Sequence, residues 1–215
     1  MVSTITDNKD ISKELILKKL QKDKYYYGDF GKQFLSNSDI INLLQNPKGF
    51  RVKQEQTKPM LEGRYFHTKI LEPNKINDFT VLDVTSRTTK AFKDLPDDQK
   101  VNALLVKEKE HLDYLCSTMT SNLECSDLIY ASDNEYEVPG LETILNETWK
   151  GKADIINHTQ DLIIDIKTSG DVDKFKYSAN SYNYDSQAYI YQRMFNKQLI
   201  FIVIDKRNAR LKICD

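Results

Sequence analysis

The chain has 215 residues, of which 40% are apolar and 29% are charged, and its formal net charge is −1. This composition is typical of a globular protein with a sizeable core, so it excludes wholesale disorder and any need for disulfide or metal staples. The longest apolar run, residues 199–204, is too short to span a membrane. Residues 1–10 lack the apolar segment of a signal peptide, and three cysteines lack metal-ligand spacing, so we expect a reduced, cytoplasmic setting.

Charge is unevenly distributed along the chain. Residues 1–60 carry a net charge of +4, residues 61–173 carry −10, and residues 174–215 carry +5. Two basic flanks around an acidic middle would suit a polyanion bound beside a metal held by carboxylates. Charge also varies along chains that bind no polyanion, so this pattern alone decides nothing.

The first half of the chain has mostly helical periodicity. Residues 11–20 form an amphipathic pattern, which ends at the run Tyr25-Tyr26-Tyr27-Gly28. Ser36 is a good N-cap for a helix over residues 37–45, which closes before Pro47. A second helix is predicted over residues 58–71 and a strand over 79–84. A long helix is predicted over 94–119, opened by Asp94 with Pro96 just inside.

The second half changes to the periodicity of strands. Strands are predicted over residues 135–138, 143–149, 152–157 and 162–168, with Pro139-Gly140, Gly151 and residues 158–161 as breaks. A helix follows over 184–195, then a central strand over 199–205 and an edge strand over 210–214. This order predicts an α/β (α+β) fold with a mixed central sheet flanked by helices. We expect residues 1–33 to form a polar arm with a short helix, and residues 34–215 to form a single domain.

The most informative residues lie on two apolar strands. On the strand 162–168, Ile163, Asp165 and Lys167 share one face, and buried charges are costly unless they are paired or bind a metal. If the hairpin turns between Thr159 and Gln160, Asp154 lies opposite Asp165 on the same face, whereas a slip of one residue would separate them.

This pairing has a chemical consequence. Two carboxylates about 5 Å apart repel each other, and a divalent cation between them removes the repulsion. Two carboxylates plus water are the usual ligands of Mg²⁺ in proteins. Lys167 could orient or deprotonate a water, or stabilise charge developing on a phosphate. The alternative is an edge hairpin with a surface Asp–Lys pair, which the apolar neighbours of Asp165 disfavour.

The pattern Asp154-x10-Asp165-x-Lys167 resembles the PD-(D/E)xK nuclease core, and Gln187-x-x-x-Tyr191 resembles the Q-x-x-x-Y motif of its RecB-like exonuclease branch. Three further segments are similar to segments of RecE-like exonucleases (exodeoxyribonuclease VIII): residues 34–47, residues 61–73 and the run that begins at Arg87. The resemblance covers residues 34 to 215 and implies a restriction-endonuclease-like core with helices in the first half and the catalytic sheet in the second.

The resemblance also implies roles for individual residues. The metal shell would comprise the side chains of two aspartates and a helix histidine with one backbone carbonyl: Asp154, Asp165, His67 and Ile166. Lys167 matches the catalytic lysine, while Gln187 and Tyr191 match the helix that supports the site and meets DNA. Ala153 stands where the family has proline, which is not a ligand. For the acidic residue ahead of the core we prefer Glu137 to Glu135.

The implied activity is Mg²⁺-dependent hydrolysis of linear duplex DNA from its ends, 5′ to 3′, with Mn²⁺ able to substitute. Arg51, Arg64 and Arg87 are candidates for contacts with DNA phosphates. The resemblance further implies a ring-shaped homo-oligomer, no membrane association, a single-strand annealing recombinase as partner, and a bacterial or phage-infected host cytoplasm.

Other interpretations remain open at this point. One is an endonuclease of the same superfamily; a CRISPR adaptation nuclease would carry four cluster cysteines, and this chain has three. Others are a non-catalytic DNA-binding protein on the same fold and a plain interaction domain. Tyr177, Tyr182 and Tyr184, with nearby lysines, could stack on bases or form a loop over the sheet.

Overall fold

The computed structural model describes residues 4–52 and 56–215, with only the backbone described for residues 4–11, and residues 1–3 of the predicted arm lie outside it. The chain forms two compact units. The first comprises Met1–Val52, Asp133–Asp165 and Lys176–Ile200; the second comprises Lys53–Ser132, Ile166–Phe175 and Phe201–Asp215. No helix among the described residues is long and apolar enough to cross a membrane. The predicted boundary at residue 33 stays a prediction.

A five-stranded sheet has the order β3-β4-β5-β6-β7, with antiparallel β3–β4, β4–β5 and β6–β7 pairs, and this mixed α/β architecture confirms the predicted fold class. Its strands are β3 (Asn134–Ile144), β4 (Glu147–Asn157), β5 (Leu162–Ser169), β6 (Gln198–Asp205) and β7 (Leu211–Cys214). The predicted edge strand is thus β7, and the predicted central strand is β6.

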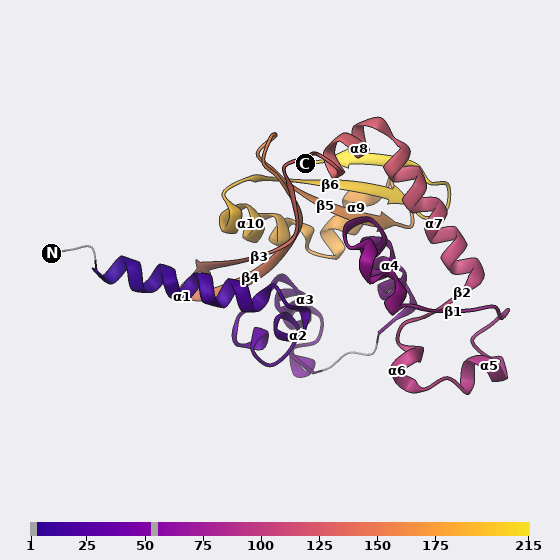
Figure 1. Cartoon of the computed structure of the whole chain (residues 1–215). Coiled ribbons are helices and arrows are strands. Elements are labelled where there is room, and N and C mark those ends of the chain that lie inside the picture. Colours follow the sequence, from indigo (N-terminus) through magenta and orange to yellow (C-terminus); the bar gives the residue numbers. More distant parts are fainter. Residues whose placement is uncertain (1–3, 53–55) are drawn as a thin grey trace. The chain divides into compact units, whose positions relative to one another are not determined.

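The first unit joins the β3–β4 hairpin to five α-helices and two short 3-10 turns. They are α1 (Thr4–Leu20), α2 (Asp23–Tyr26), η1 (Gly31–Gln33), α3 (Asn37–Gln45), η2 (Pro47–Gly49), α9 (Phe175–Ser181) and α10 (Tyr184–Phe195). Helix α1 contacts β3, and Leu20, Tyr26 and Leu141 form a buried apolar cluster that joins α1 and α2 to the hairpin (Figure 1). Helix α1 ends at Leu20 as predicted, and the separate, short α2 ends at Tyr26, inside the run Tyr25–Gly28 that was predicted as a break.

Helix α3 begins and ends where the sequence predicts. The Asp39 carboxylate accepts hydrogen bonds from the Ser36 backbone amide at 2.8 Å and from the Ser36 hydroxyl at 3.0 Å. This capping satisfies a backbone donor that would otherwise be unpaired at the helix start.

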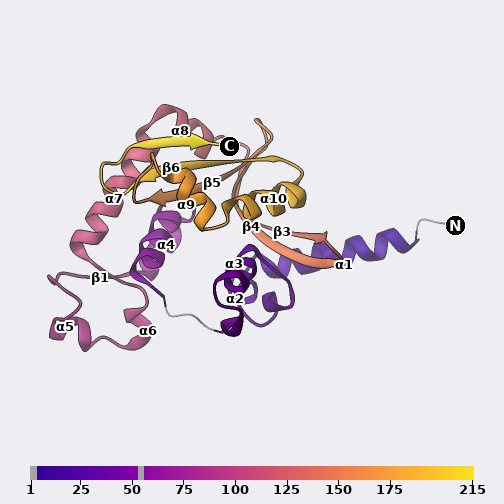
Figure 2. The ribbon, with the colours of Figure 1, turned by 180° about the vertical axis from the view of Figure 1, so that it is seen from behind.

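Two predicted breaks in the sheet were wrong. Gly140 and Gly151 lie within β3 and β4, where they pair with each other, and Pro139 pairs with Lys152. A Cβ at Gly140 would lie 2.4 Å from Met194 Sδ, and one at Gly151 would lie 2.8 Å from Tyr191 Cε1. The glycines therefore allow close packing of α10 against the hairpin (Figure 2) rather than ending its strands.

The predicted strand over residues 143–149 was also wrong, because it contains a turn. Strand β3 ends at Ile144 and β4 begins at Glu147, and the connecting residues Leu145 and Asn146 both have positive φ. Two consecutive residues with positive φ are typical of a tight hairpin turn with I′ geometry, although Leu at such a position is unusual. Propensity alone therefore did not reveal this turn.

The second unit contains a two-stranded parallel sheet and helices that pack around α7. Its further elements are α4 (Lys58–Leu71), η3 (Pro73–Asp78), β1 (Thr80–Leu82), α5 (Lys90–Lys93), α6 (Asp97–Lys100), β2 (Ala103–Leu105), α7 (Val106–Ser121) and α8 (Leu123–Ile129). Helix α4 has its predicted bounds and packs on α7, while β1 falls within the predicted strand 79–84. In the first unit, α9 lies where the sequence left open a loop over the sheet.

The predicted long helix over residues 94–119 was wrong. Pro96 caps only the short α6, and Ala103–Leu105 is a buried strand paired with β1. Burial on all sides removes the alternation that distinguishes a strand from a helix, so this apolar run merged with the pattern of α7. Helix α7 begins anew at Val106, where the Glu108 carboxylate accepts a hydrogen bond from the Leu105 amide at 3.0 Å.

Candidate active site

The β4–β5 hairpin has the predicted register. Ile155 pairs with Ile164, Ile156 with Ile163 and Asn157 with Leu162. One further step along this register brings Asp154 level with Asp165 on the same face. Asp165 is buried, with an exposed fraction of 2%, whereas Asp154 is half-buried. The two carboxylates that the sequence singled out therefore come from directly neighbouring positions of two strands.

Glu137 extends this row onto β3. It lies between Tyr136, which pairs with Ile155, and Val138, which pairs with Ala153, so its backbone is level with Asp154. Its φ is +52°, an uncommon left-handed conformation for a residue with a side chain. In contrast, the more exposed Glu135 contacts His158 at 2.7 Å. This placement supports the choice of Glu137 over Glu135. The role of Glu137 in the site stays a prediction.

Helix α10 contributes the amide that contacts the buried carboxylate. Gln187 Nε2 donates a hydrogen bond to Asp165 Oδ2 at 2.8 Å, and Gln187 is itself buried. One turn later, the hydroxyl of Tyr191 accepts a hydrogen bond from the Lys152 backbone amide at 3.3 Å. The two residues of the predicted motif thus attach α10 to β5 and β4. Tyr191 is 9% exposed, and its predicted contact with DNA stays a prediction.

The sequence prediction overlooked two buried lysines beside this row. Lys150 and Lys152 alternate with Asp154 along β4, so the three share a face. Lys152 Nζ lies 2.6 Å from Asp23 Oδ1 and 3.6 Å from Glu137 Oε2. The signal was present in the spacing Lys150-x-Lys152-x-Asp154, which puts a charged side chain at every second position along one face of the strand.

The donor set fits a hard divalent cation. Glu137, Asp154 and Asp165 offer carboxylate oxygens from neighbouring strand positions, and oxygen is the ligand that Mg²⁺ and Mn²⁺ prefer. As the side chains stand, no group of three or more His, Cys, Asp or Glu residues in the described ranges is gathered as a metal site. The backbone therefore places Glu137, Asp154 and Asp165 at neighbouring positions, from which their carboxylates could bind a metal ion.

The remaining predicted ligands and the lysine belong to the second unit. Lys167 is half-buried and follows Asp165 by two positions on β5, so strand alternation gives it the same face, and Ile166 between them is fully buried. His67 lies on α4, half-buried, with its ring 6.4 Å from that of Phe66. The roles of Ile166, Lys167 and His67 in metal binding and catalysis stay predictions.

The three predicted arginines make contacts within the protein. The Arg51 guanidinium donates to the backbone carbonyls of Lys32 and Phe34 at 2.5 and 3.2 Å. Arg64 donates to the Asn102 side chain at 2.5 Å. Arg87 forms a two-pronged ion pair with Glu108, with one branch at 2.8 Å. Each arginine therefore has a structural role within the protein. The predicted contacts of these arginines with DNA stay predictions.

Comparison with known proteins places this geometry in a family. Residues 18–208 match the family described as PDDEXK-like domain of unknown function (DUF3799). No curated protein matches the chain. A crystal structure described as that of a putative exonuclease from Eubacterium rectale is 14% identical, with a TM-score of 0.60 over 89% of this chain and 76% of that one.

A phage-related exonuclease from Haemophilus somnus is 21% identical, over 65% of this chain and 66% of that one. Its TM-score of 0.29 is too low to bear on the fold. The structure from Eubacterium rectale supports the fold alone, while the family match spans most of the chain. The chain therefore belongs to the PDDEXK-like family and has the PD-(D/E)xK type of nuclease fold.

Proposed function

We propose that this protein is a divalent-metal-dependent DNA exonuclease that hydrolyses phosphodiester bonds of linear duplex DNA. The observation that supports the proposal is the β4–β5 register, whose next step beyond the Ile155–Ile164 pair would bring Asp154 level with Asp165, in a chain of the PDDEXK-like family. The hydrogen bond from Gln187 to Asp165 adds to this support, because it joins the second predicted motif to the first.

In this proposal Asp154 and Asp165 bind Mg²⁺, with Glu137 as a third carboxylate and His67 and the Ile166 carbonyl completing the shell. The bound cation would polarise the phosphoryl oxygen and lower the pKa of the attacking water. Lys167 orients that water and stabilises negative charge on the phosphate. The Gln187 amide keeps the buried carboxylate of Asp165 in one orientation, since a side chain with one oxygen fixed has fewer rotamers available.

End-labelled DNA tests this proposal. Linear duplex labelled at either the 5′ or the 3′ end should release labelled nucleotides in Mg²⁺ or Mn²⁺ and release none in EDTA. We expect early loss of the 5′ label, because the resemblance implies 5′-to-3′ digestion. Asp165→Ala and Lys167→Ala should abolish release, whereas Glu135→Gln, on the exposed part of β3, should retain it.

The assay also separates the rival functions. Cleavage of a closed circular duplex would show an endonuclease, because an exonuclease requires an end. Binding of DNA without metal-stimulated cleavage of any substrate would show a non-catalytic DNA-binding protein. Unchanged release by Asp165→Ala would refute the site assignment.

The proposal also includes an oligomeric state and a protein partner. A ring-shaped homo-oligomer would keep the enzyme on the strand it digests, and a single-strand annealing recombinase would use the strand that digestion exposes. Sedimentation of the purified protein with and without linear duplex tests the first. Co-purification with an annealing protein encoded nearby tests the second.

A further inference from the structure

Two buried lysines hold the α2 segment against β4. Lys152 Nζ lies 2.6 Å from the Asp23 carboxylate at the start of α2. Lys150 Nζ donates a hydrogen bond to the Tyr26 carbonyl at 2.5 Å and lies 4.2 Å from the centre of the Tyr26 ring. Both lysines are at least nine-tenths buried, and their two contacts attach α2 to the strand, although the Asp23 side chain itself is exposed.

This attachment places Tyr27 at the border of the carboxylate row. Lys152 Nζ is 5.4 Å from the centre of the Tyr27 ring and 3.6 Å from Glu137 Oε2, and Glu137 is level with Asp154. Tyr27 therefore lies next to Glu137 and close to the carboxylate row.

Although its backbone segment is held firmly, Tyr27 is 68% exposed. Its ring meets that of Tyr26 edge-on, with centroids 4.9 Å apart and an interplanar angle of 74°. An edge-on contact leaves much of a ring available to another planar group. An aromatic ring that is fixed in place and open to solvent loses little conformational freedom when it stacks on a ligand.

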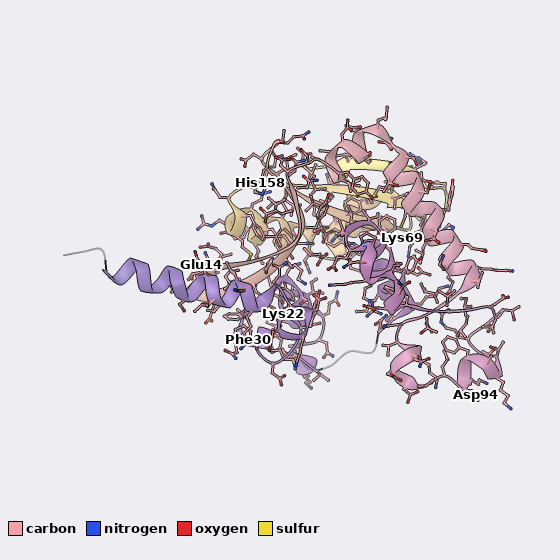
Figure 3. All side chains as sticks on the ribbon, viewed as in Figure 1. Glu14, Lys22, Phe30, Lys69, Asp94 and His158 are labelled. Carbon is pink, nitrogen blue, oxygen red and sulfur yellow. The ribbon has the colours of Figure 1, made fainter. Side chains whose placement is uncertain are left out.

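Lysines are concentrated on the chain immediately before Tyr27. The segment 18–24 carries exposed Lys18, Lys19, Lys22 and Lys24, and Figure 3 shows Lys22 where α1 gives way to α2. Exposed lysines supply sequence-independent contacts to phosphates. A basic run next to an exposed aromatic ring is the combination with which proteins bind single strands without sequence preference.

We propose that Tyr27 stacks on an unpaired nucleobase of the strand being cut, and that the lysines of segment 18–24 hold the phosphates of the same strand. The inference rests on the proposed function, to which it adds a substrate-binding element. The ligand is an unpaired DNA strand, because a base inside a duplex has no face available for stacking. Tyr27 would thus separate or hold the end nucleotides next to the carboxylates.

Binding to single strands without cleavage tests this inference. Fluorescence anisotropy of a short labelled oligothymidine, in EDTA, gives the dissociation constant of the wild-type protein and of Tyr27→Ala. We expect about ten-fold weaker binding by Tyr27→Ala, in the range of one aromatic–base stack. Tyr27→Phe and Tyr27→Trp should bind like wild type, and Tyr114→Ala, at another exposed tyrosine, on α7, is the control.

An abasic strand of the same length separates stacking from other effects. On this strand wild type and Tyr27→Ala should bind alike, because the partner of the ring is missing. Equal weakening of Tyr27→Ala on both strands, unchanged binding on both, or no binding by wild type would overturn the inference. The readout does not require cleavage, so an inactive protein that still shows the Tyr27 effect would refute only the proposed hydrolysis.

The lysines have their own expected signature. Replacing Lys22 and Lys24 together by Gln should weaken binding to the normal and the abasic strand equally, and should reduce the dependence of affinity on salt concentration. An unchanged salt dependence would remove the lysines from the proposed element.

Discussion

Asp165 is a carboxylate with an exposed fraction of 2%, and it lies on a strand whose neighbours are isoleucines. Taking such a group out of water is costly unless donors replace the lost solvent. Gln187 supplies one donor at 2.8 Å through a neutral amide, which adds no charge to a site that is proposed to bind a cation. A lysine or arginine at position 187 would compete with that cation, so the amide suits a metal ligand better.

Replacing Gln187 by Leu should therefore lower both stability and activity. The variant keeps the size of the side chain but removes the donor, which should cost about 1–3 kcal/mol in the free energy of unfolding. Urea denaturation measures this change, with Gln198→Leu at the exposed start of β6 as the control. We also expect at least ten-fold slower nucleotide release. Wild-type stability in Gln187→Leu would contradict the inferred importance of this hydrogen bond.

Glu108 illustrates a carboxylate with a structural role. Burial alone would raise its pKa, but hydrogen bonds from Arg87, the Leu105 amide and Lys58 outweigh burial and lower the pKa to about 2. Because the folded pKa lies below the ordinary value, this group stabilises the fold above about pH 4.5, and the stabilisation is lost as pH falls towards 2.

Glu108→Gln should remove this part of the acid sensitivity. At pH 7 the variant should be less stable than wild type by on the order of 2–3 kcal/mol, and the difference should shrink as pH falls from about 4.5 to 2. Urea denaturation at several pH values checks this. Glu110→Gln, at an exposed position of α7, is the matched control. A difference that does not change with pH would show that the charge of Glu108 is not the cause.

At the scale of elements, single residues decide whether two elements can approach each other. A Cβ on Gly151 would lie 2.8 Å from the ring of Tyr191, which cannot bend away as a flexible side chain would. Gly63, in the middle of α4, has no atom within 4 Å of such a Cβ. The two glycines therefore have opposite expected responses to alanine.

Gly151→Ala should destabilise the protein by about 1–3 kcal/mol, because it forces apart α10 and β4. Gly63→Ala should stabilise it by about 0.5–1 kcal/mol, since alanine is the better helix former and fits the open space. Thermal or urea denaturation of both variants gives the comparison. Equal effects of the two substitutions would mean that the packing of α10 does not require glycine at position 151.

The elements that the sequence predicted well share a local signal. Helices α3, α4 and α10 have their predicted bounds, because a one-sided apolar pattern is encoded locally, as are the capping side chains of α3 and α4. Gly140 and Gly151 misled the prediction, because glycine serves close packing as well as turns, and only the folded structure shows which. The Ala103–Leu105 strand was missed because its pairing with β1 is not local.

For the whole molecule, the alternation of net charge along the chain has a structural counterpart within the first unit. The basic N-terminal segment reaches the β3–β4 hairpin through α1 and α2, and that hairpin carries Glu137 and Asp154. The register that joins Asp154 to Asp165 could be predicted from the sequence, because one slip would reverse every side chain of an apolar strand. The contribution of α2 could not be predicted from the sequence, because the contacts of Lys150 and Lys152 connect residues far apart in the chain.

The central claim is that Asp154 and Asp165 together bind the divalent cation used for cleavage. Titration of the protein with Mn²⁺, followed by electron paramagnetic resonance of the free ion, tests it most directly. We predict saturable binding that is weakened at least ten-fold in Asp154→Asn and in Asp165→Asn, and that is unchanged in Asp185→Asn at the exposed start of α10. Binding of Mn²⁺ with wild-type affinity by both the Asp154 and the Asp165 variants would contradict the account.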